Sequence, residues 1–177
     1  METLEQVAQR VAAGDTAAFQ HIVRHTGDLL VRLAARILGN VADAEDTVQE
    51  AYVKAYRALV NGQFDGRSSV RTWLYRIVTH AAIDGLRHRR RRDARLDSEL
   101  PSAWDGAALA EARLALTELS DLLRGLPPDQ RAALVLKSVE GLTTPEIAQI
   151  MDCSVGAVEQ RLVRARAALR SRREGHD

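Results

Sequence analysis

Residues 141–170, GLTTPEIAQIMDCSVGAVEQRLVRARAALR, have the spacing of a short helix, a tight turn and a longer helix. Thr144 is the expected N-cap of the first helix, because Pro145 would then occupy the first helical position, where proline is favoured. Asp152 favours the turn, since aspartate tolerates a left-handed backbone better than most residues do. Small Ala148 would let the two helices approach closely. The stretch therefore predicts a helix-turn-helix.

The second helix of this unit has an apolar side and a polar side. Ser154 is its expected N-cap, and the apolar positions that recur at helical spacing are Val155, Val158, Leu162 and Ala165. A helix-turn-helix presents the first residues of its second helix to base edges in the major groove of DNA. The positions expected to face DNA are Ser154, Gly156, Ala157, Glu159, Gln160, Arg161 and Arg164. The alternative is an ordinary helical hairpin whose arginines are solvated.

The rest of the chain also has the pattern of helices rather than strands. Aromatic residues make up only 4% of the sequence, and Ala, Leu, Arg and Glu are its most frequent residues, which favours helix. We expect Asp43 or a neighbour to begin one helix, and Ser68 or Ser69 to cap another. The segments with helical spacing are 15–39, 43–61, 71–92, 109–124 and 128 onward. The predicted fold is all-α, with two small helical domains joined by a flexible linker and a helix-turn-helix in the C-terminal domain.

Charge is unevenly distributed, although the net charge is only +1. Residues 67–92 hold eight arginines and one acid, Asp84, and residues 161–173 hold six arginines and no acid. The segment between them, 93–125, is acidic. Two basic segments separated by an acidic one indicate two surfaces that bind a polyanion, joined by a segment that avoids it.

The first basic segment also contains aromatic residues. Trp73 and Tyr75 lie among arginines in RTWLYRIVTHAAIDGLRHRRRR, residues 71–92. Arginines neutralise phosphates, whereas aromatic faces stack on unpaired bases or enclose an extruded one. Trp73 has a second interpretation, core packing with its apolar neighbours, which we favour over base stacking. The run from Arg89 to Arg92 is predicted to hold duplex DNA.

Three stretches together resemble the extracytoplasmic-function members of the sigma-70 family. The helix-turn-helix, preceded by LRGLPPDQRAALVLKSVEGL, resembles region 4 of that family. DAEDTVQEAYVKAYRAL resembles its polymerase-binding helix, and FDGRSSVRTWLYRIVTHAAIDGLRHRRRR resembles its −10 recognition and melting segment. The resemblance covers almost the whole chain in the order of the family. It implies a factor that binds core RNA polymerase and directs it to promoters.

The resemblance also implies domains and site residues. Residues 1–92 would form the region 2 domain, 93–108 the linker and 109–177 the region 4 domain, which reads the −35 element with its helix-turn-helix. Asp46, Gln49 and Glu50 match the DxxQE pattern of the polymerase-binding helix, although Thr47 stands where the family commonly has Leu. The residues implied for the −10 element are Phe64, Arg67, Ser68, Ser69, Arg71, Arg76, His80 and Arg87. An anti-sigma factor is a further implied partner.

Enzymatic and membrane functions are not expected. The chain has no phosphate-binding glycine loop and no nucleophile beside a base. His21 and His25 are four residues apart without an acid or cysteine companion, so we expect exposed histidines, no metal and no cofactor. Cys153 is expected to be a small packing residue, with a redox role as the alternative. No apolar run is long enough to cross a bilayer and METLEQVAQR has no signal-peptide pattern, so a cytoplasmic protein without membrane insertion is expected.

Two other functions remain open at this point. A LuxR-like transcriptional regulator would share the pattern LTTPEIAQIM…SVGAV, but its N-terminal half should be a ligand or phosphate sensor, which this half does not resemble. An adaptor protein would use the same helices to bind only proteins. Transcription from a promoter with core polymerase distinguishes a sigma factor from both.

Overall fold

The computed structural model describes residues 2–93, 120–123 and 125–174, and the elements in this part of the chain are all helical. They are α1 (Leu4–Ala12), the short 3-10 helix η1 (Thr16–Ala18), α2 (Phe19–Leu38), α3 (Val41–Val60), α4 (Val70–Asp93), α6 (Pro128–Ser138), α7 (Thr144–Ile150) and α8 (Val155–Glu174). The all-α prediction is therefore confirmed. The linker expected at 93–108 lies almost wholly outside the described residues, as does most of the helix expected at 109–124.

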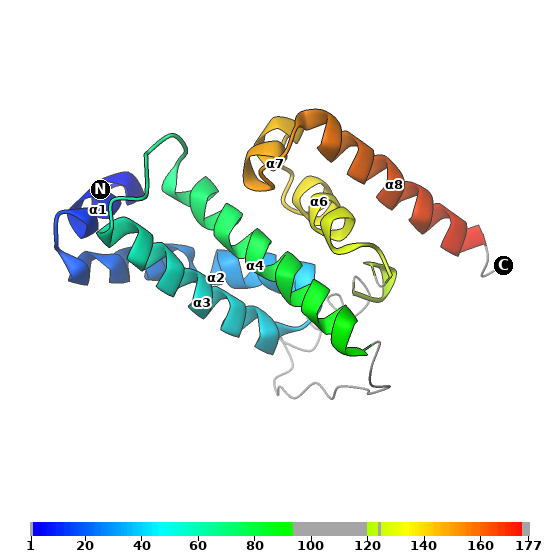
Figure 1. The fold of residues 1–177 in the computed structure, drawn as a ribbon, viewed down its shortest axis with the longest axis horizontal. Coiled ribbons are helices and arrows are strands. Elements are labelled where there is room, and N and C mark those ends of the chain that lie inside the picture. The colour runs from blue at the N-terminus through cyan, green and yellow to red at the C-terminus, as the bar shows by residue number, and fades with distance from the viewer. Residues whose placement is uncertain (1, 94–119, 124, 175–177) are drawn as a thin grey trace.

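Helices α1 to α4 pack around an apolar core in the N-terminal half (Figure 1). The largest buried side chains of α2 include Ile22, Leu30, Leu33 and Ile37, at the helical spacing that the sequence predicts. Gly39 ends α2 in the left-handed conformation, with φ 76°. Asn40 rather than Asp43 is the N-cap of α3, because its side chain accepts a hydrogen bond from the Asp43 N–H.

Helix α1 was not expected from the sequence, although its start has a recognisable signal. Thr3 and Gln6 form a capping box, in which each side chain accepts a hydrogen bond from the backbone N–H of the other residue. Val7, Ala8 and Val11 bury the inner side of this short helix. At nine residues, α1 is too short for its apolar spacing alone to predict a helix.

The helix-turn-helix is present, with two corrections to its details. Thr143, not Thr144, is the N-cap of α7, so Pro145 occupies the second helical position. The turn is as predicted: Asp152 has a left-handed φ of 53°, and the hydroxyl of Ser154 accepts a hydrogen bond from the Ala157 N–H.

The inner side of α8 begins later than expected. Val158, Leu162 and Ala165 are buried, but Val155 is 41% exposed. Val155 is the first residue of α8, where the chain has just left the turn, so α7 does not cover it.

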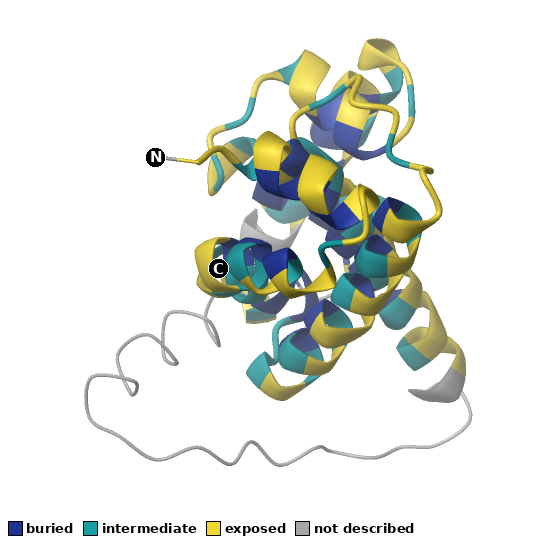
Figure 2. Ribbon diagram, turned by 90° about the vertical axis from the view of Figure 1, so that its left-hand side faces the viewer, coloured by how far each residue is buried: buried dark blue, intermediate teal, exposed yellow. Residues whose placement is uncertain are grey.

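The two halves of the molecule lie side by side, and α4 is the helix at their boundary (Figure 1). One side of α4 packs on α2 and α3, and it also contacts α6 and α7 of the C-terminal half. Buried residues lie where helices face one another, and exposed residues line the outside (Figure 2). The position of α4 places its arginines beside the helix-turn-helix.

Candidate nucleic-acid interface

Helix α4 presents the charged residues expected at the −10 element on its exposed side. Ser69 caps the helix, because its hydroxyl accepts a hydrogen bond from the Thr72 N–H. The side chains of Arg71, Arg76, His80 and Arg87 are all exposed. Leu74 and Val78, on the other side, are buried in the core. Helix α4 therefore has one buried apolar side and one exposed polar side, and the exposed side is available to a ligand.

A cavity of about 520 Å³ lies between the loop before α4 and the first turns of this helix. Its walls are formed by Gln63, Phe64, Asp65, Arg67, Ser68, Thr72, Trp73, Arg76, Ile77 and Gln149. The rings of Phe64 and Trp73 contact each other there, with their centroids 4.7 Å apart. Trp73 also packs against the core, as the favoured interpretation of the sequence has it. Aromatic walls can stack on a planar base, and the arginines beside them can bind its phosphate.

Helix α8 offers a second polar surface. Ser154, Gly156, Glu159, Gln160 and Arg164 are exposed, while Ala157 and Arg161 are half-buried. Nη1 of Arg161 donates a hydrogen bond to Sγ of Cys153, 2.8 Å away. Cys153 packs partly against the core, as the sequence predicts. Arg161 is thus held in place by the turn, whereas Arg164 extends into solvent.

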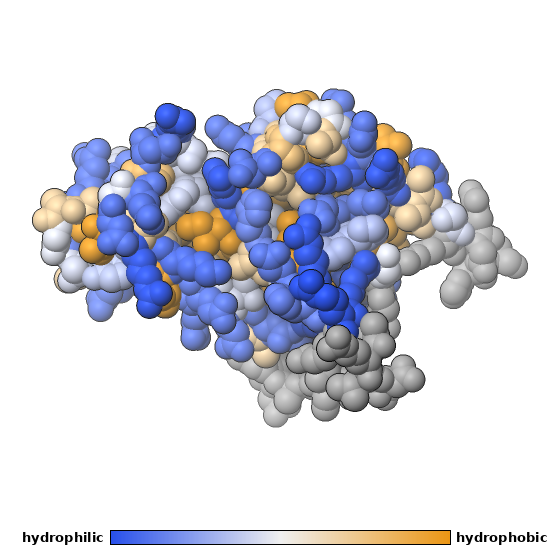
Figure 3. Space-filling view, viewed as in Figure 1, coloured by the Kyte–Doolittle hydropathy of each residue, from blue (hydrophilic) through white to orange (hydrophobic). Residues whose placement is uncertain are grey.

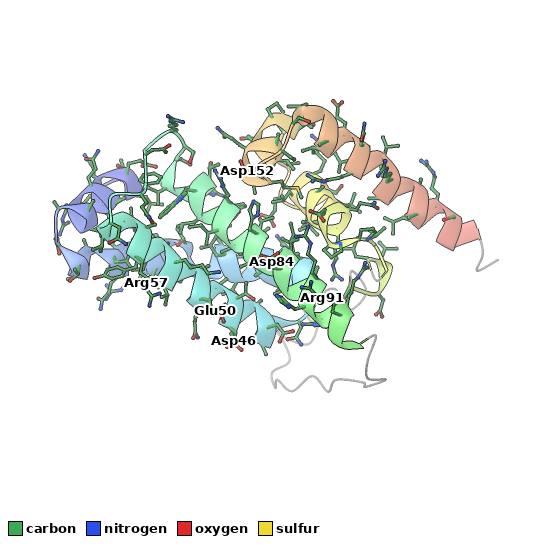
Figure 4. The ribbon with its side chains drawn as sticks, in the orientation of Figure 1. Asp46, Glu50, Arg57, Asp84, Arg91 and Asp152 are labelled. Carbon is green, nitrogen blue, oxygen red and sulfur yellow. The ribbon has the colours of Figure 1, made fainter. Side chains whose placement is uncertain are left out.

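Asp46, Gln49 and Glu50 form a third polar surface, on the exposed side of α3. Asp46 and Glu50 project from the edge of α3 that is turned away from α7 (Figure 4). Val53 continues the same face one helical turn later and is 50% exposed. The opposite side of α3, which includes Val48, is buried. This surface lies on α3, whereas the arginines expected at the −10 element lie on α4 and in the loop before it.

Three carboxylates of the C-terminal half meet the N-terminal half, and two of them pair with arginines of α4. Oδ2 of Asp152 lies 3.0 Å from Nη2 of Arg76, and Oδ2 of Asp129 lies 2.9 Å from Nη2 of Arg87. The hydrogen bond with Asp129 raises the pKa of the Arg87 guanidinium. In Figure 4, Asp152 lies on the side of α7 that faces α4. Two arginines expected to contact DNA therefore pair with acids of the C-terminal half.

The third carboxylate, Glu140, is nearly buried in the turn after α6. Its side chain is 8% exposed and lies 2.5 Å from Nη1 of Arg36 on α2. The hydroxyl of Tyr75 on α4 donates a hydrogen bond of 3.1 Å to the other carboxylate oxygen. Burial raises the pKa of the Tyr75 hydroxyl, so it stays a donor at neutral pH. Glu140 thus connects the turn after α6, in the C-terminal half, with α2 and α4 in the N-terminal half.

The contacts of these acids with the N-terminal half were not predicted from the sequence. Asp129 appears there only as a first-turn acid of α6, and Glu140 as a polar residue before a glycine. Gln149 of α7 is exposed, and it also lines the cavity next to α4. No spacing pattern in the sequence predicts the contacts of these acids with α4, because more than 40 residues separate the two partners of each contact.

Several arginines of the basic run at the end of α4, residues 89–92, contact other residues of the protein. Arg89 forms an ion pair with Asp43, and Arg90 donates a hydrogen bond to the backbone oxygen of Leu126. Nη2 of Arg91 lies 3.3 Å from Nδ1 of His88. Only part of this run is therefore oriented toward solvent in the described structure.

The remaining candidates do not form a site in the part of the chain that the structure describes. His21 and His25 stack on each other, 3.9 Å between ring centroids, and among the described residues no group of three possible metal ligands occurs. No described helix is long and apolar enough to span a bilayer. The face seen in Figure 3 is mainly hydrophilic, with small separate apolar patches.

Known protein families match both halves of the chain. Residues 22–92 match the model of Sigma-70 region 2, and residues 116–169 match that of Sigma-70, region 4. The first match contains α3 and nearly all of α4, and the second contains the helix-turn-helix. The exposed polar surfaces described above all lie within these two segments.

Similar proteins cover nearly the whole chain. The ECF RNA polymerase sigma-E factor of Escherichia coli (strain K12) is 37% identical over 179 residues, which cover 94% of this chain and 92% of that protein. The RNA polymerase sigma-H factor of Pseudomonas aeruginosa is 35% identical, over 93% of this chain and 91% of its own length. Among solved structures, CnrH in complex with the cytosolic domain of CnrY has a TM-score of 0.70 and 29% identity, with 97% of each chain covered.

Proposed function

The chain belongs to the sigma-70 family and directs RNA polymerase to promoters, and we propose that α3, α4 and α8 divide this task between polymerase, the melted −10 element and the −35 duplex. The main support for this function is that one chain contains both sigma regions, with region 2 before region 4 as in the family. A LuxR-like regulator has no reason to contain region 2. Sigma factors are initiation factors rather than enzymes.

The proposed domains follow the sequence. Residues 1–92 form the domain that binds polymerase and the −10 element, 93–108 the linker, and 109–177 the domain that binds the −35 element. Helix α4 extends to Asp93, one residue beyond the proposed boundary. We expect the protein to act in the cytoplasm, where polymerase and promoters are found.

The polymerase contact is assigned to Asp46, Gln49 and Glu50. They are exposed on one side of α3, and an exposed polar face opposite a buried apolar one is available to a protein partner. Exposed Val53 adds apolar area to the same face. Because these residues lie on α3 and the proposed DNA contacts lie on other elements, we expect polymerase and DNA to bind at the same time.

The −10 contacts are assigned to the cavity and the exposed side of α4. An extruded base would enter the cavity between Phe64 and Trp73, where aromatic faces are available for stacking. The backbone on either side would be held by arginines. The proposed residues are Phe64, Arg67, Ser68, Ser69, Arg71, Arg76, His80 and Arg87.

The −35 contacts are assigned to the start of α8. Its N-terminal residues are exposed, as entry into a major groove requires, and the hydrogen bond with Cys153 orients Arg161. The proposed residues are Ser154, Gly156, Ala157, Glu159, Gln160, Arg161 and Arg164.

An anti-sigma factor is the proposed regulatory partner. Its support is the solved relative CnrH, which was determined in complex with the cytosolic domain of CnrY. Such a partner would act by controlling access of the promoter surfaces to DNA.

Reconstituted transcription tests the function directly. The full chain is mixed with core RNA polymerase and a library of duplex promoters, and the transcripts are sequenced. We expect transcripts that start at a defined distance from shared −10 and −35 elements and that require the protein. Transcripts that are the same without the protein would contradict the function, and binding of duplex DNA without transcription would favour a regulator.

A further inference from the structure

The first turn of α4 is held by a side chain of α1, which is distant in the sequence. Oε1 of Glu5 accepts a hydrogen bond of 3.2 Å from the Val70 N–H, and the two residues lie 65 positions apart. Val70 is the first residue of α4, and an N–H at this position has no acceptor within its own helix. Helix α1 lies beside the end of α3 and the start of α4 (Figure 1). Glu5 therefore supplies an acceptor that α4 cannot supply itself.

The carboxylate of Glu5 stands between two helix N-termini. Glu5 belongs to the first turn of α1, and its side chain also binds the first N–H of α4. The N-terminus of a helix carries a partial positive charge, which stabilises a carboxylate placed there. Both helix ends therefore favour the position that this side chain takes.

Helix α1 is a firm support for Glu5, because both of its ends are tied down. At the start, Thr3 and Gln6 form the capping box. Nη1 of Arg10 lies 2.9 Å from the carboxylate of Glu2, and Nη2 of Arg10 pairs with Asp15, the N-cap of η1. The helix thus has side-chain contacts before, within and after its nine residues.

The loop that walls the −10 cavity, residues 61–69, is anchored at each end. At its start, the Gln63 N–H donates a hydrogen bond of 2.8 Å to the backbone oxygen of Ala58 on α3. At its end, Ser69 caps α4, and Glu5 binds the next N–H along the chain. The anchors at Ala58 and Ser69 are local in the sequence, whereas the anchor at Glu5 is a tertiary contact.

The relative position of this loop and the first turns of α4 sets the width of the cavity. Phe64 comes from the loop and Trp73 from α4, and their ring centroids are 4.7 Å apart. A shift of the start of α4 against the loop would change the separation of these rings. Glu5 opposes such a shift, because its hydrogen bond ends on the backbone of the first turn.

We propose that Glu5 is a positioning residue of the −10 site, which acts through the Val70 N–H to hold Phe64 and Trp73 at the separation that an extruded base requires. Glu5 itself does not contact the base. This inference rests on the proposed −10 contacts, but the effect of Glu5 on the cavity can be measured in the free chain.

The first experiment measures the exposure of Trp73 without polymerase or DNA. The chain has two tryptophans, so Trp104→Phe leaves Trp73 as the only tryptophan fluorophore. In this background, Glu5→Ala should increase quenching of the fluorescence by acrylamide at unchanged helix content, because the loop no longer holds Phe64 against the indole. Asp28→Ala, which removes an exposed acid of α2, is the charge-matched control and should leave quenching unchanged. Equal quenching of the native chain and Glu5→Ala would overturn the proposal.

A conservative variant separates the hydrogen bond from the charge of the side chain. Glu5→Gln keeps an oxygen that can accept from the Val70 N–H, so its quenching should lie close to that of the native chain. If Glu5→Gln were quenched as strongly as Glu5→Ala, the hydrogen bond would not be the cause, and the proposed mechanism would be wrong.

The second experiment measures capture of single-stranded −10 DNA by the complex of the full chain with core polymerase. Glu5→Ala should bind the oligonucleotide about two- to fivefold more weakly, the range expected when a helix-capping hydrogen bond is lost. A series of oligonucleotides in which each position in turn lacks its base identifies the origin of the loss. For one abasic position the native chain and Glu5→Ala should bind equally, because no base then enters the cavity.

Two results of the second experiment would contradict the proposal. The same loss for every abasic oligonucleotide would mean that Glu5 acts only on the general stability of the complex. Tighter binding of every oligonucleotide by Glu5→Ala would mean that this carboxylate merely repels phosphates.

Failure of the positioning role and failure of the −10 assignment give different results. If Glu5 has no positioning role, quenching of Trp73 is the same in all variants, while the native complex still captures −10 DNA. If the −10 assignment is wrong, the native complex binds the intact and the abasic oligonucleotides equally, whatever the quenching of Trp73 shows.

Discussion

The indole of Trp73 lies against the ring of Phe64, with centroids 4.7 Å apart and ring planes inclined by 44°. Trp73 comes from α4 and Phe64 from the loop before it, and both line the same cavity. Trp73 therefore packs on the core with one part of its ring system and borders the cavity with another. Substitutions of Trp73 can therefore distinguish a role of its aromatic face in the cavity from a role of its volume in the core.

Trp73→Leu should weaken capture of single-stranded −10 DNA by the polymerase complex. Leucine keeps apolar packing but removes the stacking face. Stacking on one base contributes about 1–3 kcal/mol, which corresponds to a loss of roughly 5- to 150-fold in affinity. Fluorescence anisotropy with a labelled oligonucleotide measures this, and Trp73→Phe serves as the aromatic control. Unchanged binding by both variants would leave Trp73 with a packing role only.

Replacing Gln49 and Glu50 by Ala should weaken binding to core polymerase by about tenfold, as expected when central polar contacts of an interface are truncated. The free energy of unfolding should hardly change, because both side chains are exposed. Surface plasmon resonance with immobilised core polymerase gives the affinity. The matched control replaces Gln9 and Asp28, an exposed amide and an exposed carboxylate on α1 and α2. A normal affinity in the first variant would remove this face of α3 from the interface.

His80→Asn should change the preferred −10 base more than it changes overall affinity. His80 is exposed on α4. Asn offers a donor and an acceptor on one amide, whereas neutral His offers one of each on a rigid ring. Sequencing the transcripts from a library randomised in the −10 element measures the preference. Indistinguishable profiles for the two proteins would exclude His80 from this site.

Glu159→Lys should tighten binding to unrelated duplex DNA and lower discrimination at one −35 base. Glu159 is exposed near the start of α8 and makes no ion pair with Arg161 or Arg164, so its carboxylate is available to accept from cytosine N4. One added phosphate contact would steepen the salt dependence by about one unit of slope. Titrations on matched and single-base-changed duplexes measure both effects, and Glu159→Gln separates loss of the acid from gain of the lysine. A parental slope and preference in the lysine variant would place Glu159 outside the interface.

The capping box of α7 predicts a stability effect that depends on pH. The side chain and backbone N–H of Thr143 donate hydrogen bonds to Glu146, and these bonds lower the pKa of its carboxyl below the ordinary value. The stabilisation by the carboxylate is therefore complete at neutral pH and is lost as the pH falls through the pKa of the folded state. Urea unfolding at several pH values should show Glu146→Ala less stable than the native chain at pH 7, with a smaller difference in acid. A difference independent of pH would contradict the assignment.

Much of the secondary structure could be predicted because its causes are local. Gly39 and Asp152 adopt left-handed backbones at the positions where the sequence places turns, and Ser154 caps α8 as expected. The errors are also local: Thr143 caps α7 in place of Thr144, and Asn40 caps α3 in place of Asp43. In each case two residues within one turn are able to cap, and the backbone geometry chooses between them.

The site could be predicted only as separate surfaces. The sequence indicates the polar face of α3, the arginines of α4 and the exposed start of α8, because exposure follows from helical periodicity. It does not indicate that Gln149 borders the cavity of α4, or that Tyr75 donates to Glu140. Those contacts depend on how two separate helical units pack.

By itself, the sequence determined the helices, the helix-turn-helix and the two basic segments, since caps, turns and apolar spacing act over a few residues of chain. Only the tertiary structure decided that Asp152 meets Arg76 and that Asp129 meets Arg87. Many acids could have paired with these arginines, and partly exposed ion pairs contribute too little free energy to leave a pattern in the sequence. The partner of each arginine is therefore selected by the packing of α4 against α6 and α7.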